Sequence, residues 1–347
     1  MLVYLFCFLI SFFLCYILTF KIKGLALSCG IVDCPGEPRK IQKKPVPLLG
    51  GVALYISFLA VLVLSFGLGW LNDGIITLNQ IIAIVSGGFI ILVVGFLDDK
   101  YNLGPKSFVG PLLAALIAVG FGITVGYVTN PFLTGTGPYG RALFYFSGFA
   151  GSIFSWLWLL GMMYTTKFLD GLDGLVSGIG AIGAVILFIV SLFWDVPQSA
   201  TSILALILAG VCLGFLFHNW HPARIFLGES GSVFIGFMLG VLSIISGGKI
   251  ATALLLMGIP ILDVIWVILR RILSEKKSPF RADSKHLHYR LVKAGLSQRQ
   301  AVLFLYFWTA LFGTASLFLQ SRHKVAALIL VGLVMLALVL VLIRRRD

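Results

Sequence analysis

The chain has 347 residues, of which 59% are hydrophobic and only 11% are charged, and its formal net charge is +13. Soluble domains carry about 25% charged residues, so this chain has too few to coat a water-soluble globule of its size. Nucleic-acid binding is the other usual interpretation of a basic chain. Here the positive charges are spread over short loops and no nucleic-acid-binding module is present, so we expect no nucleic-acid partner. The composition favours an integral membrane protein.

The apolar runs are long and do not alternate with polar residues, which predicts spanning helices rather than barrel strands. A helix needs roughly 20 apolar residues to cross the bilayer. We therefore expect an all-α, polytopic membrane bundle that forms one domain over residues 1–347, and a loop at 129–146. About eleven spans are predicted, near 1–20, 48–70, 80–97, 108–128, 147–164, 175–194, 199–217, 231–247, 250–269, 301–320 and 325–343.

Basic residues indicate the orientation of these spans. If Lys21 and Lys23 lie inside, alternation of the spans places 22 of the 26 Lys and Arg inside, and leaves four outside: Arg141, Lys249, Arg322 and Lys324. The positive-inside rule predicts this asymmetry. We therefore expect a multi-pass protein of the plasma (inner) membrane whose catalytic loops face the cytoplasm. A basic inner face also suits anionic lipids and anionic substrates.

Acidic residues are concentrated on the same side. Of the 13 Asp and Glu, only Asp73 and Asp195 fall outside. Six of the inner acids lie at or near the ends of spans: Asp98, Asp99, Asp170, Asp173, Glu229 and Asp263. Carboxylates at a membrane border are costly unless they are paired or bind a cation. Simple solvation explains any one of them equally well, but it is a weaker explanation for six on one face.

Two pairs of aspartates suggest a site for a cation or a phosphate. Asp98 and Asp99 are adjacent, and on a helix they would point about 100° apart. Two anions this close favour a bound cation or a shared proton. Asp170 and Asp173 are three residues apart, which would place both on one face if the segment is helical. The alternative for the second pair is a solvated helix start, where acids favour the helix dipole.

Two later inner segments add further candidates. Glu229 lies between Gly228 and Ser230 just before a span, where a carboxylate and free backbone N–H groups suit a phosphate and its cation. The longest inner loop, 270–300, contains His286 and His288 among basic residues. No third ligand is evident for zinc, so the two histidines and their basic neighbours favour binding of a diphosphate. The alternative is a pair of ordinary hydrogen-bonded polar residues.

Five segments in order resemble the polyprenyl-phosphate N-acetylhexosamine-1-phosphate transferases, which form glycosyltransferase family 4. They run from residue 33 to 291 and comprise residues 33–51, residues 98–106, residues 168–175, residues 219–232 and residues 286–291. The short form of the first motif and the histidine pair with a single gap are more similar to the branch that moves N-acetylglucosamine phosphate. The branch that moves muramoyl-pentapeptide phosphate usually carries three consecutive histidines.

This resemblance implies a membrane enzyme, a phosphotransferase that acts on a UDP-sugar and a polyprenyl phosphate such as undecaprenyl phosphate. N-acetylhexosamine-1-phosphate, from UDP-N-acetylglucosamine in the favoured branch, would pass to the lipid with release of UMP. This step would initiate cell-envelope (cell wall) glycan synthesis, for example of lipopolysaccharide or teichoic acid. The alternatives are a phospho-N-acetylmuramoyl-pentapeptide transferase, a catalytically altered relative, or a lipid transporter. A homodimer is compatible with the sequence.

The resemblance also implies roles for particular residues. The expected catalytic residues are Asp98, Asp99, Asp170, Asp173, His286 and His288. The expected substrate-binding residues are Arg39, Lys40, Lys106, Lys167, Asn219, Arg224, Phe226, Gly228 and Arg290. The expected metal ligands, for Mg²⁺, are Glu229, Asp98 and Asp99.

Two positions depart from the family pattern. Lys167 stands where the family usually has Asn, and Glu229 stands where it usually has Asp; both positions are associated in the family with Mg²⁺. A lysine ammonium group cannot coordinate a metal ion, which puts the Mg²⁺ cofactor in doubt. One hypothesis is that Lys167 pairs with Glu229 and takes over part of the neutralisation, while any Mg²⁺ shifts toward Asp98, Asp99 or Glu229. The other is that Lys167 turns away and Mg²⁺ binds as usual.

Overall fold

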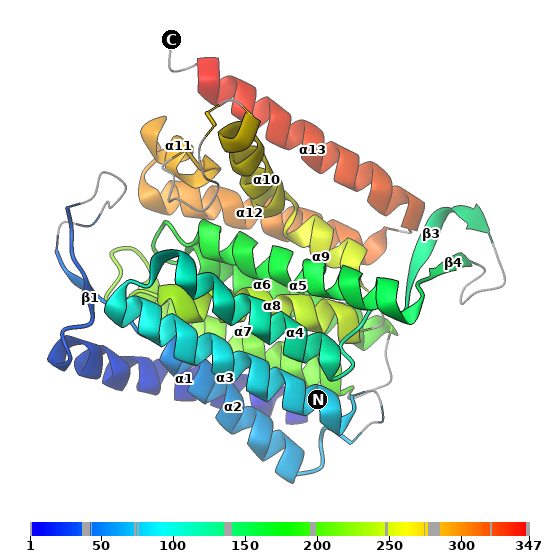
Figure 1. Ribbon diagram of the computed structural model, residues 1–347, viewed down its shortest axis with the longest axis horizontal. Coiled ribbons are helices and arrows are strands. Elements are labelled where there is room, and N and C mark those ends of the chain that lie inside the picture. Colours follow the sequence, from blue (N-terminus) through cyan, green and yellow to red (C-terminus); the bar gives the residue numbers. More distant parts are fainter. Residues whose placement is uncertain are drawn as a thin grey trace.

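The computed structural model describes residues 2–36, 42, 44–72, 74, 76–134, 141–194, 199–246, 249–273, 275–276, 285–319 and 321–344. Helices dominate the architecture (Figure 1). They are α1 (Leu2–Ser28), α2 (Gly50–Gly67), α3 (Leu78–Tyr101), the 3-10 helix η1 (Gly104–Phe108), α4 (Val109–Gly120), α5 (Gly148–Leu169), α6 (Leu175–Trp194), α7 (Ala200–Asn219), α8 (Gly228–Ile245), α9 (Ile250–Leu256), α10 (Gly258–Leu273), α11 (Leu287–Lys293), α12 (Gln298–Phe318) and α13 (Ser321–Arg344).

Every predicted span overlaps at least one helix, but the expected number of eleven is not confirmed. Within the described residues, eight helices are long and apolar enough to cross a membrane: α1, α2, α3, α6, α7, α8, α12 and α13. The bent pair α9–α10 would make a ninth span. Helix α4 has only 12 residues and follows η1 directly. The chain is therefore a multi-pass, largely helical membrane protein.

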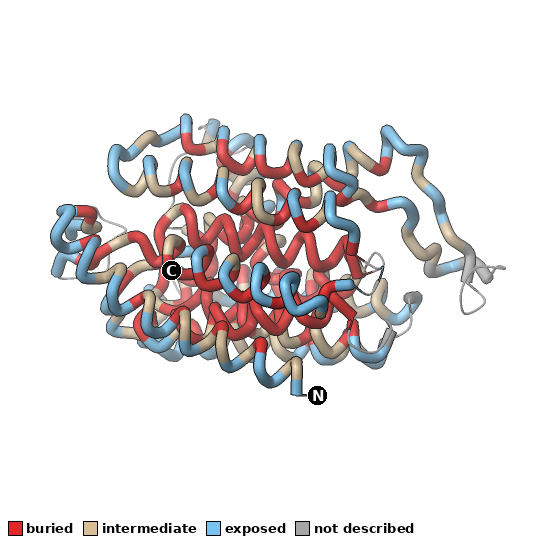
Figure 2. Tube along the Cα trace, turned by 90° about the horizontal axis from the view of Figure 1, so that it is seen from below, coloured by how far each residue is buried: buried red, intermediate tan, exposed pale blue. Residues whose placement is uncertain are grey.

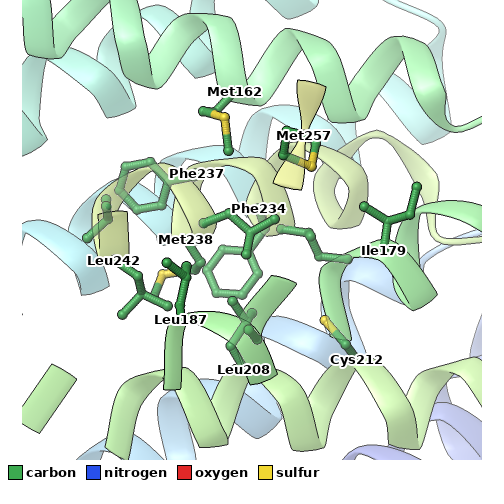
Figure 3. Close-up of a cluster of buried hydrophobic side chains, with 14 of the residues drawn as sticks. Met162, Ile179, Leu187, Leu208, Cys212, Phe234, Phe237, Met238, Leu242 and Met257 are labelled. Carbon is green, nitrogen blue, oxygen red and sulfur yellow. The ribbon is translucent and has the colours of Figure 1, made fainter. Parts of the chain in front are cut away.

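Helix α8 forms the centre of the bundle. Every residue of α8 is buried except Glu229 in its first turn. It packs against α2, α3, α5, α6, α7 and α9. Figure 3 shows Phe234, Phe237 and Met238 of α8 surrounded by apolar side chains from neighbouring helices, including Met162 and Leu208. A helix that is apolar all round requires such an enclosed position, and it leaves Glu229 at the one end where a charge can reach a polar site.

Buried and exposed residues alternate along the outer helices (Figure 2), and many of the exposed residues are large and apolar. Leu2, Phe13 and Phe20 of α1 are 83%, 55% and 70% exposed. Soluble proteins rarely expose continuous apolar surface on this scale. On these helices it is the surface that faces lipid.

The predicted span at 250–269 is not one straight helix. It divides into α9 and α10, which meet at an angle of 75°. Pro260 stands in the first turn of α10 and cannot donate the hydrogen bond that would continue α9, and its ring would also clash with the carbonyl of Leu256. The break turns α10 so that Asp263 reaches the loop that precedes α11.

The segment 129–146, predicted to be a loop, contains most of a β-hairpin, which is a small exception within a predominantly helical fold. Strands β3 (Tyr127–Thr134) and β4 (Arg141–Tyr145) pair antiparallel. Aromatic and β-branched residues favour strands, although Pro131 and the following glycines suggested a loop. A second, very short sheet pairs β1 (Val32–Asp33) with β2 (Val46–Pro47). In Figure 1 the hairpin and the β1–α11 region lie at opposite ends of the bundle.

Candidate active site

A cavity of about 1380 Å³ lies where the inner segments meet. The end of α3, η1, the α5–α6 turn, the α7–α8 connection and the start of α11 contribute to its wall, together with the β1–β2 region. The acids that line it are Asp33, Asp98, Asp99, Asp170, Asp173 and Glu229. Five of the six inner acids predicted at the ends of spans therefore line one cavity, and the sixth, Asp263, does not.

The first aspartate pair lies at the end of α3 and has two different environments. Asp98 Oδ1 accepts a hydrogen bond from the backbone N–H of Gly104 (3.2 Å). Asp99 Oδ1 accepts one from the backbone N–H of Glu229 (2.9 Å). Asp99 Oδ2 is buried and has no hydrogen-bond partner among the residues that the structure describes. The N–H of Glu229 is therefore already used by Asp99 and is not one of the free backbone N–H groups expected at this helix start.

A glycine makes this contact between α3 and α8 possible. Gly228 has φ +75°, a left-handed conformation that favours glycine. A Cβ atom at this position would also collide with the carboxylate of Asp99. Gly228 thus lets the start of α8 approach the Asp99 side chain closely, and this approach brings Glu229 into the cavity.

Lys167 lies among the carboxylates and is paired with one of them. Its Nζ atom forms an ion pair with Glu229 Oε1 and donates a hydrogen bond to Ser107 Oγ (3.0 Å). The ammonium group also lies 4.4 Å from the centroid of the Phe108 ring. The side chains of Lys167 and Glu229 are only 15% and 13% exposed. The predicted pairing is confirmed, and the alternative in which Lys167 turns away is wrong.

The second aspartate pair lies on the turn between α5 and α6, not on a helix face. Asp173 Oδ2 accepts hydrogen bonds from His221 Nδ1 (2.7 Å) and from the backbone N–H of Ala223 (3.0 Å). Asp170 is an exposed residue of the cavity wall, although many protein atoms lie around its carboxyl group. The loss of hydration, together with repulsion from Glu229 and Asp173, raises the pKa of Asp170 to about 7. Asp170 is therefore suited to exchange a proton at neutral pH.

The two histidines of the fifth segment have separate roles. His286 lines the cavity, and its Nδ1 atom lies 2.8 Å from Asp263 Oδ2. His288 is only 1% exposed and does not line the cavity, and within the described part of the chain neither of its ring nitrogens has a hydrogen-bond partner. Burial lowers the pKa of His288 well below its usual value, so its ring is neutral. Both histidines were expected to act on substrate, but of the two only His286 lies at the cavity, where it could reach a substrate.

The substrate-binding candidates are divided in the same way. Asn219, Phe226 and Gly228 line the cavity with Lys167, whereas Lys106, Arg224 and Arg290 do not. Asn219 is committed to structure, since its Oδ1 atom accepts from Gly174 N–H (3.0 Å) and its Nδ2 atom donates to Ile225 O (3.0 Å). Arg290 donates from Nε to the backbone oxygen of Lys285 (2.7 Å). Arg39 and Lys40 lie outside the described residues.

The structure brings to the site one residue that the sequence did not single out, His221, and gives a position to Asp263, which the sequence marked only as an inner acid. His221 lines the cavity and is held by Asp173, and Asp263 holds His286 from behind. His221 lies within the fourth motif segment, residues 219–232, so its position in that motif could have marked it as a site residue. Asp263 had been singled out as an inner acid, but the bend that aims it at His286 is not readable from composition.

The described donor set does not fit the expected Mg²⁺ site. Among the residues that the structure describes, no group of three or more His, Cys, Asp or Glu side chains is close enough to hold one metal ion. Glu229, an expected ligand, is neutralised by Lys167. Asp98 and Asp99 each have one carboxylate oxygen engaged by a backbone N–H group. The position beside Glu229 is therefore already occupied by a cation, the ammonium group of Lys167.

Comparisons with known proteins indicate the family of this chain. The family model described as glycosyl transferase family 4 matches residues 81–247. The chain is 34% identical to a probable undecaprenyl-phosphate N-acetylglucosaminyl 1-phosphate transferase of Bacillus subtilis, over 90% of this chain and 84% of the relative. It is 32% identical to the decaprenyl-phosphate N-acetylglucosaminephosphotransferase of Mycolicibacterium smegmatis, over 94% and 85%.

A more distant relative belongs to another branch. The phospho-N-acetylmuramoyl-pentapeptide-transferase of Desulforudis audaxviator is 30% identical over 80% of this chain and 85% of the relative. The match to the Bacillus protein covers most of both chains. The region that matches the family model contains Asp98, Asp99, Lys167, Asp170 and Glu229. On these similarities and on the convergence of its motif segments at one cavity, the chain is a member of glycosyl transferase family 4.

Proposed function

We propose that this protein transfers N-acetylglucosamine-1-phosphate from UDP-N-acetylglucosamine to a polyprenyl phosphate, releasing UMP. The chief support is the cavity in which six carboxylates from four separate segments lie together with Lys167, which pairs with one of them, Glu229. The names of the relatives at 32–34% identity supply the amino sugar and the class of lipid acceptor. Exposed apolar side chains on the outer helices give the prenyl chain a lipid route to the site.

The proposed reaction joins two phosphates. An oxygen of the lipid phosphate forms a bond to the β-phosphorus of the UDP-sugar. The bond from that phosphorus to the oxygen bridging the two phosphates breaks, and its electron pair leaves with UMP. Phosphoryl transfer needs little covalent help from the protein, because positioning and neutralisation of charge dominate. Lys167 would lie against the diphosphate, and His286, held by Asp263, would donate to a phosphate oxygen.

Asp170 is the carboxyl group best suited to move a proton in this reaction. Its pKa of about 7 lies where a general base is most effective at neutral pH. We propose that Asp170 takes the remaining proton of the lipid phosphate before the attack. Asp98 and Asp99, at the end of α3, would orient the lipid phosphate at the membrane border.

We further propose that the protein lies in the plasma membrane with this cavity facing the cytoplasm. The asymmetry of Lys and Arg supports this orientation. The hairpin β3–β4 would then lie on the outer side, because it is at the opposite end of the bundle from β1 and α11 (Figure 1).

The test is transfer of radiolabel by the purified protein. Detergent-solubilised enzyme is incubated with undecaprenyl phosphate and UDP-N-acetylglucosamine labelled in the sugar. We expect labelled lipid and UMP in equal amounts, and a strong loss of both with Asp170→Asn. Lys100→Asn, at an exposed position outside the cavity, is the matched control.

Other outcomes would point to other functions. Labelled lipid formed only from UDP-N-acetylmuramoyl-pentapeptide would favour the muramoyl-pentapeptide branch. UMP released without a lipid product would indicate hydrolysis. Substrates left unchanged, with lipid moved across a vesicle membrane, would indicate a transporter.

A further inference from the structure

The ion pair between Lys167 and Glu229 has a consequence for the cation that this site uses. Glu229 is the only residue of α8 that is not buried, and it reaches the cavity at the start of the helix. Its partner Lys167 is in the last turn of α5. A cation is thus fixed between two central helices that pack against each other, at the point where the acids converge.

Lys167 is held there by three different contacts. Besides the ion pair with Glu229, its ammonium group donates to Ser107 Oγ and lies over the face of the Phe108 ring. An aromatic face attracts a cation, and a mostly buried ammonium group requires such partners. Because Ser107 and Phe108 come from η1, three separate segments are arranged around this one cation. It is not a loosely held surface lysine.

The charge that the pair contributes differs from that of a metal site. An asparagine, an aspartate and a divalent ion would together carry a formal charge of +1, whereas Lys167 and Glu229 together carry zero. A lysine nitrogen also has no lone pair for a metal while it is protonated, and it competes with any divalent ion for Glu229. A metal ion at Glu229 would therefore have to displace the ammonium group from its carboxylate.

We propose that the Lys167 ammonium group is the resident cation of this site, and that it replaces the divalent ion which the Asn and Asp of similar proteins would hold. It contacts the diphosphate of the UDP-sugar directly, and Glu229 positions it. The identity of the diphosphate rests on the proposed function. The assignment of Lys167 as the resident cation does not depend on that function. The expected result is an enzyme whose core site needs no added metal.

Binding of Mn²⁺ tests the cation separately from catalysis. Protein freed of metal with EDTA and then desalted is titrated with Mn²⁺ alone, and free Mn²⁺ is followed by electron paramagnetic resonance. We expect the wild type to bind Mn²⁺ at least about tenfold more weakly than the double variant Lys167→Asn/Glu229→Asp, the size of change typical when the surroundings of a metal site are altered. Equal and tight binding by both proteins would overturn the proposal.

A single substitution provides a second test that does not depend on the folding of the double variant. In Glu229→Gln the ammonium group keeps its other two contacts and loses only the compensating charge. We expect this variant to bind UDP at least as tightly as the wild type in EDTA, measured by calorimetry. If Glu229 instead held a metal ion, Glu229→Gln would lose UDP affinity, and EDTA would lower the UDP affinity of the wild type to the same level. For the double variant, Lys100→Asn serves as the control for the loss of a lysine.

The two proposals fail in different ways. Lipid product that disappears in EDTA and returns with Mg²⁺, together with tight binding of Mn²⁺ by the wild type, would leave the transferase function standing and overturn the resident cation. Weak Mn²⁺ binding by the wild type, with no lipid product under any condition, would leave the resident cation standing and overturn the transferase function. Activity of the wild type that persists in EDTA, and activity of the double variant that requires Mg²⁺, would support both.

Discussion

Asp263 Oδ2 lies 2.8 Å from His286 Nδ1; both side chains are largely buried, and His286 lines the cavity while Asp263 lies behind it. Asp263 Oδ1 also accepts the backbone N–H of Leu287 (2.9 Å), so one carboxylate orients both the ring and the start of α11. The arrangement fixes which ring nitrogen of His286 is turned toward the cavity. Asp263 is thus a positioning residue that acts through His286.

We expect Asp263→Asn to lower the rate of lipid product formation by about tenfold or more, comparable to the loss of other residues that orient a functional side chain. The amide of Asn presents only one acceptor oxygen, so either the ring or the Leu287 N–H group loses its partner. The measurement is kcat in the radiolabel assay, with thermal stability measured in parallel.

A double-mutant cycle separates positioning from general damage to the fold. If Asp263 acts through His286, Asp263→Asn/His286→Asn should be no slower than His286→Asn alone, and Asp263→Glu should recover part of the activity. Effects of the two substitutions that multiply independently would contradict this role.

His288 should govern stability in mildly acidic solution. Burial holds the pKa of His288 well below its usual value of 6.5, so the folded protein binds fewer protons at this residue than the unfolded chain. The contribution of His288 to stability is therefore full above pH 6.5 and is lost as the pH falls below it. We expect His288→Phe, which keeps a ring of similar shape, to reduce the fall in melting temperature between pH 7 and pH 5.

Comparing the activities of the His288→Phe and His286→Phe variants tests which of the two histidines acts at the site. Because His288 does not line the cavity, His288→Phe should retain far more activity than His286→Phe at pH 7.5. Equal loss of activity in the two variants, with the His288 variant still stably folded, would show that His288 touches the substrate.

Chemical labelling of the native cysteines should report the orientation in the membrane. Cys29 and Cys34 are exposed, whereas Cys7, Cys15 and Cys212 are buried. Cys34 also lines the cavity. If the cavity faces the cytoplasm, a membrane-impermeant maleimide should label the protein in inverted vesicles and not in intact cells.

The control for this experiment is Cys29→Ser/Cys34→Ser, which should remove the labelling in inverted vesicles. Labelling of intact cells that disappears in this double variant would place the cavity on the outer side. Addition of UDP before the maleimide should slow the labelling of Cys34 selectively.

Gly228 should tolerate no side chain. It has φ +75° and faces Asp99 across the contact between α3 and α8. We expect Gly228→Ala to lower both the melting temperature and the activity, because the added Cβ atom would push Asp99 away from the Glu229 N–H group. The matched control is Gly161→Ala within α5, where the added atom would meet open space and alanine should stabilise the helix slightly.

The sequence by itself determined the membrane class, the approximate positions of the helices and the group of acidic segments on one face. These follow from local properties: an apolar run of sufficient length has no other stable state than a membrane helix, and carboxylates avoid lipid. The pairing of Lys167 with Glu229 was also predictable, because two departures of opposite charge within one expected site compensate each other. The number of spans and the β-hairpin were not predictable, since a span bends near Pro260 whereas strand β3 continues through Pro131, and both outcomes depend on the neighbouring residues.

Only the tertiary structure decided which candidates face the cavity. His286 and His288 are two residues apart, and nothing local distinguishes them, but the turn of α10 at Pro260 brings Asp263 to His286, while His288 packs against Gly171. In the same way the approach of α8 to α3 uses the Glu229 N–H group for Asp99. Contacts of this kind join residues that are 23 and 130 positions apart, and they depend on how whole helices pack.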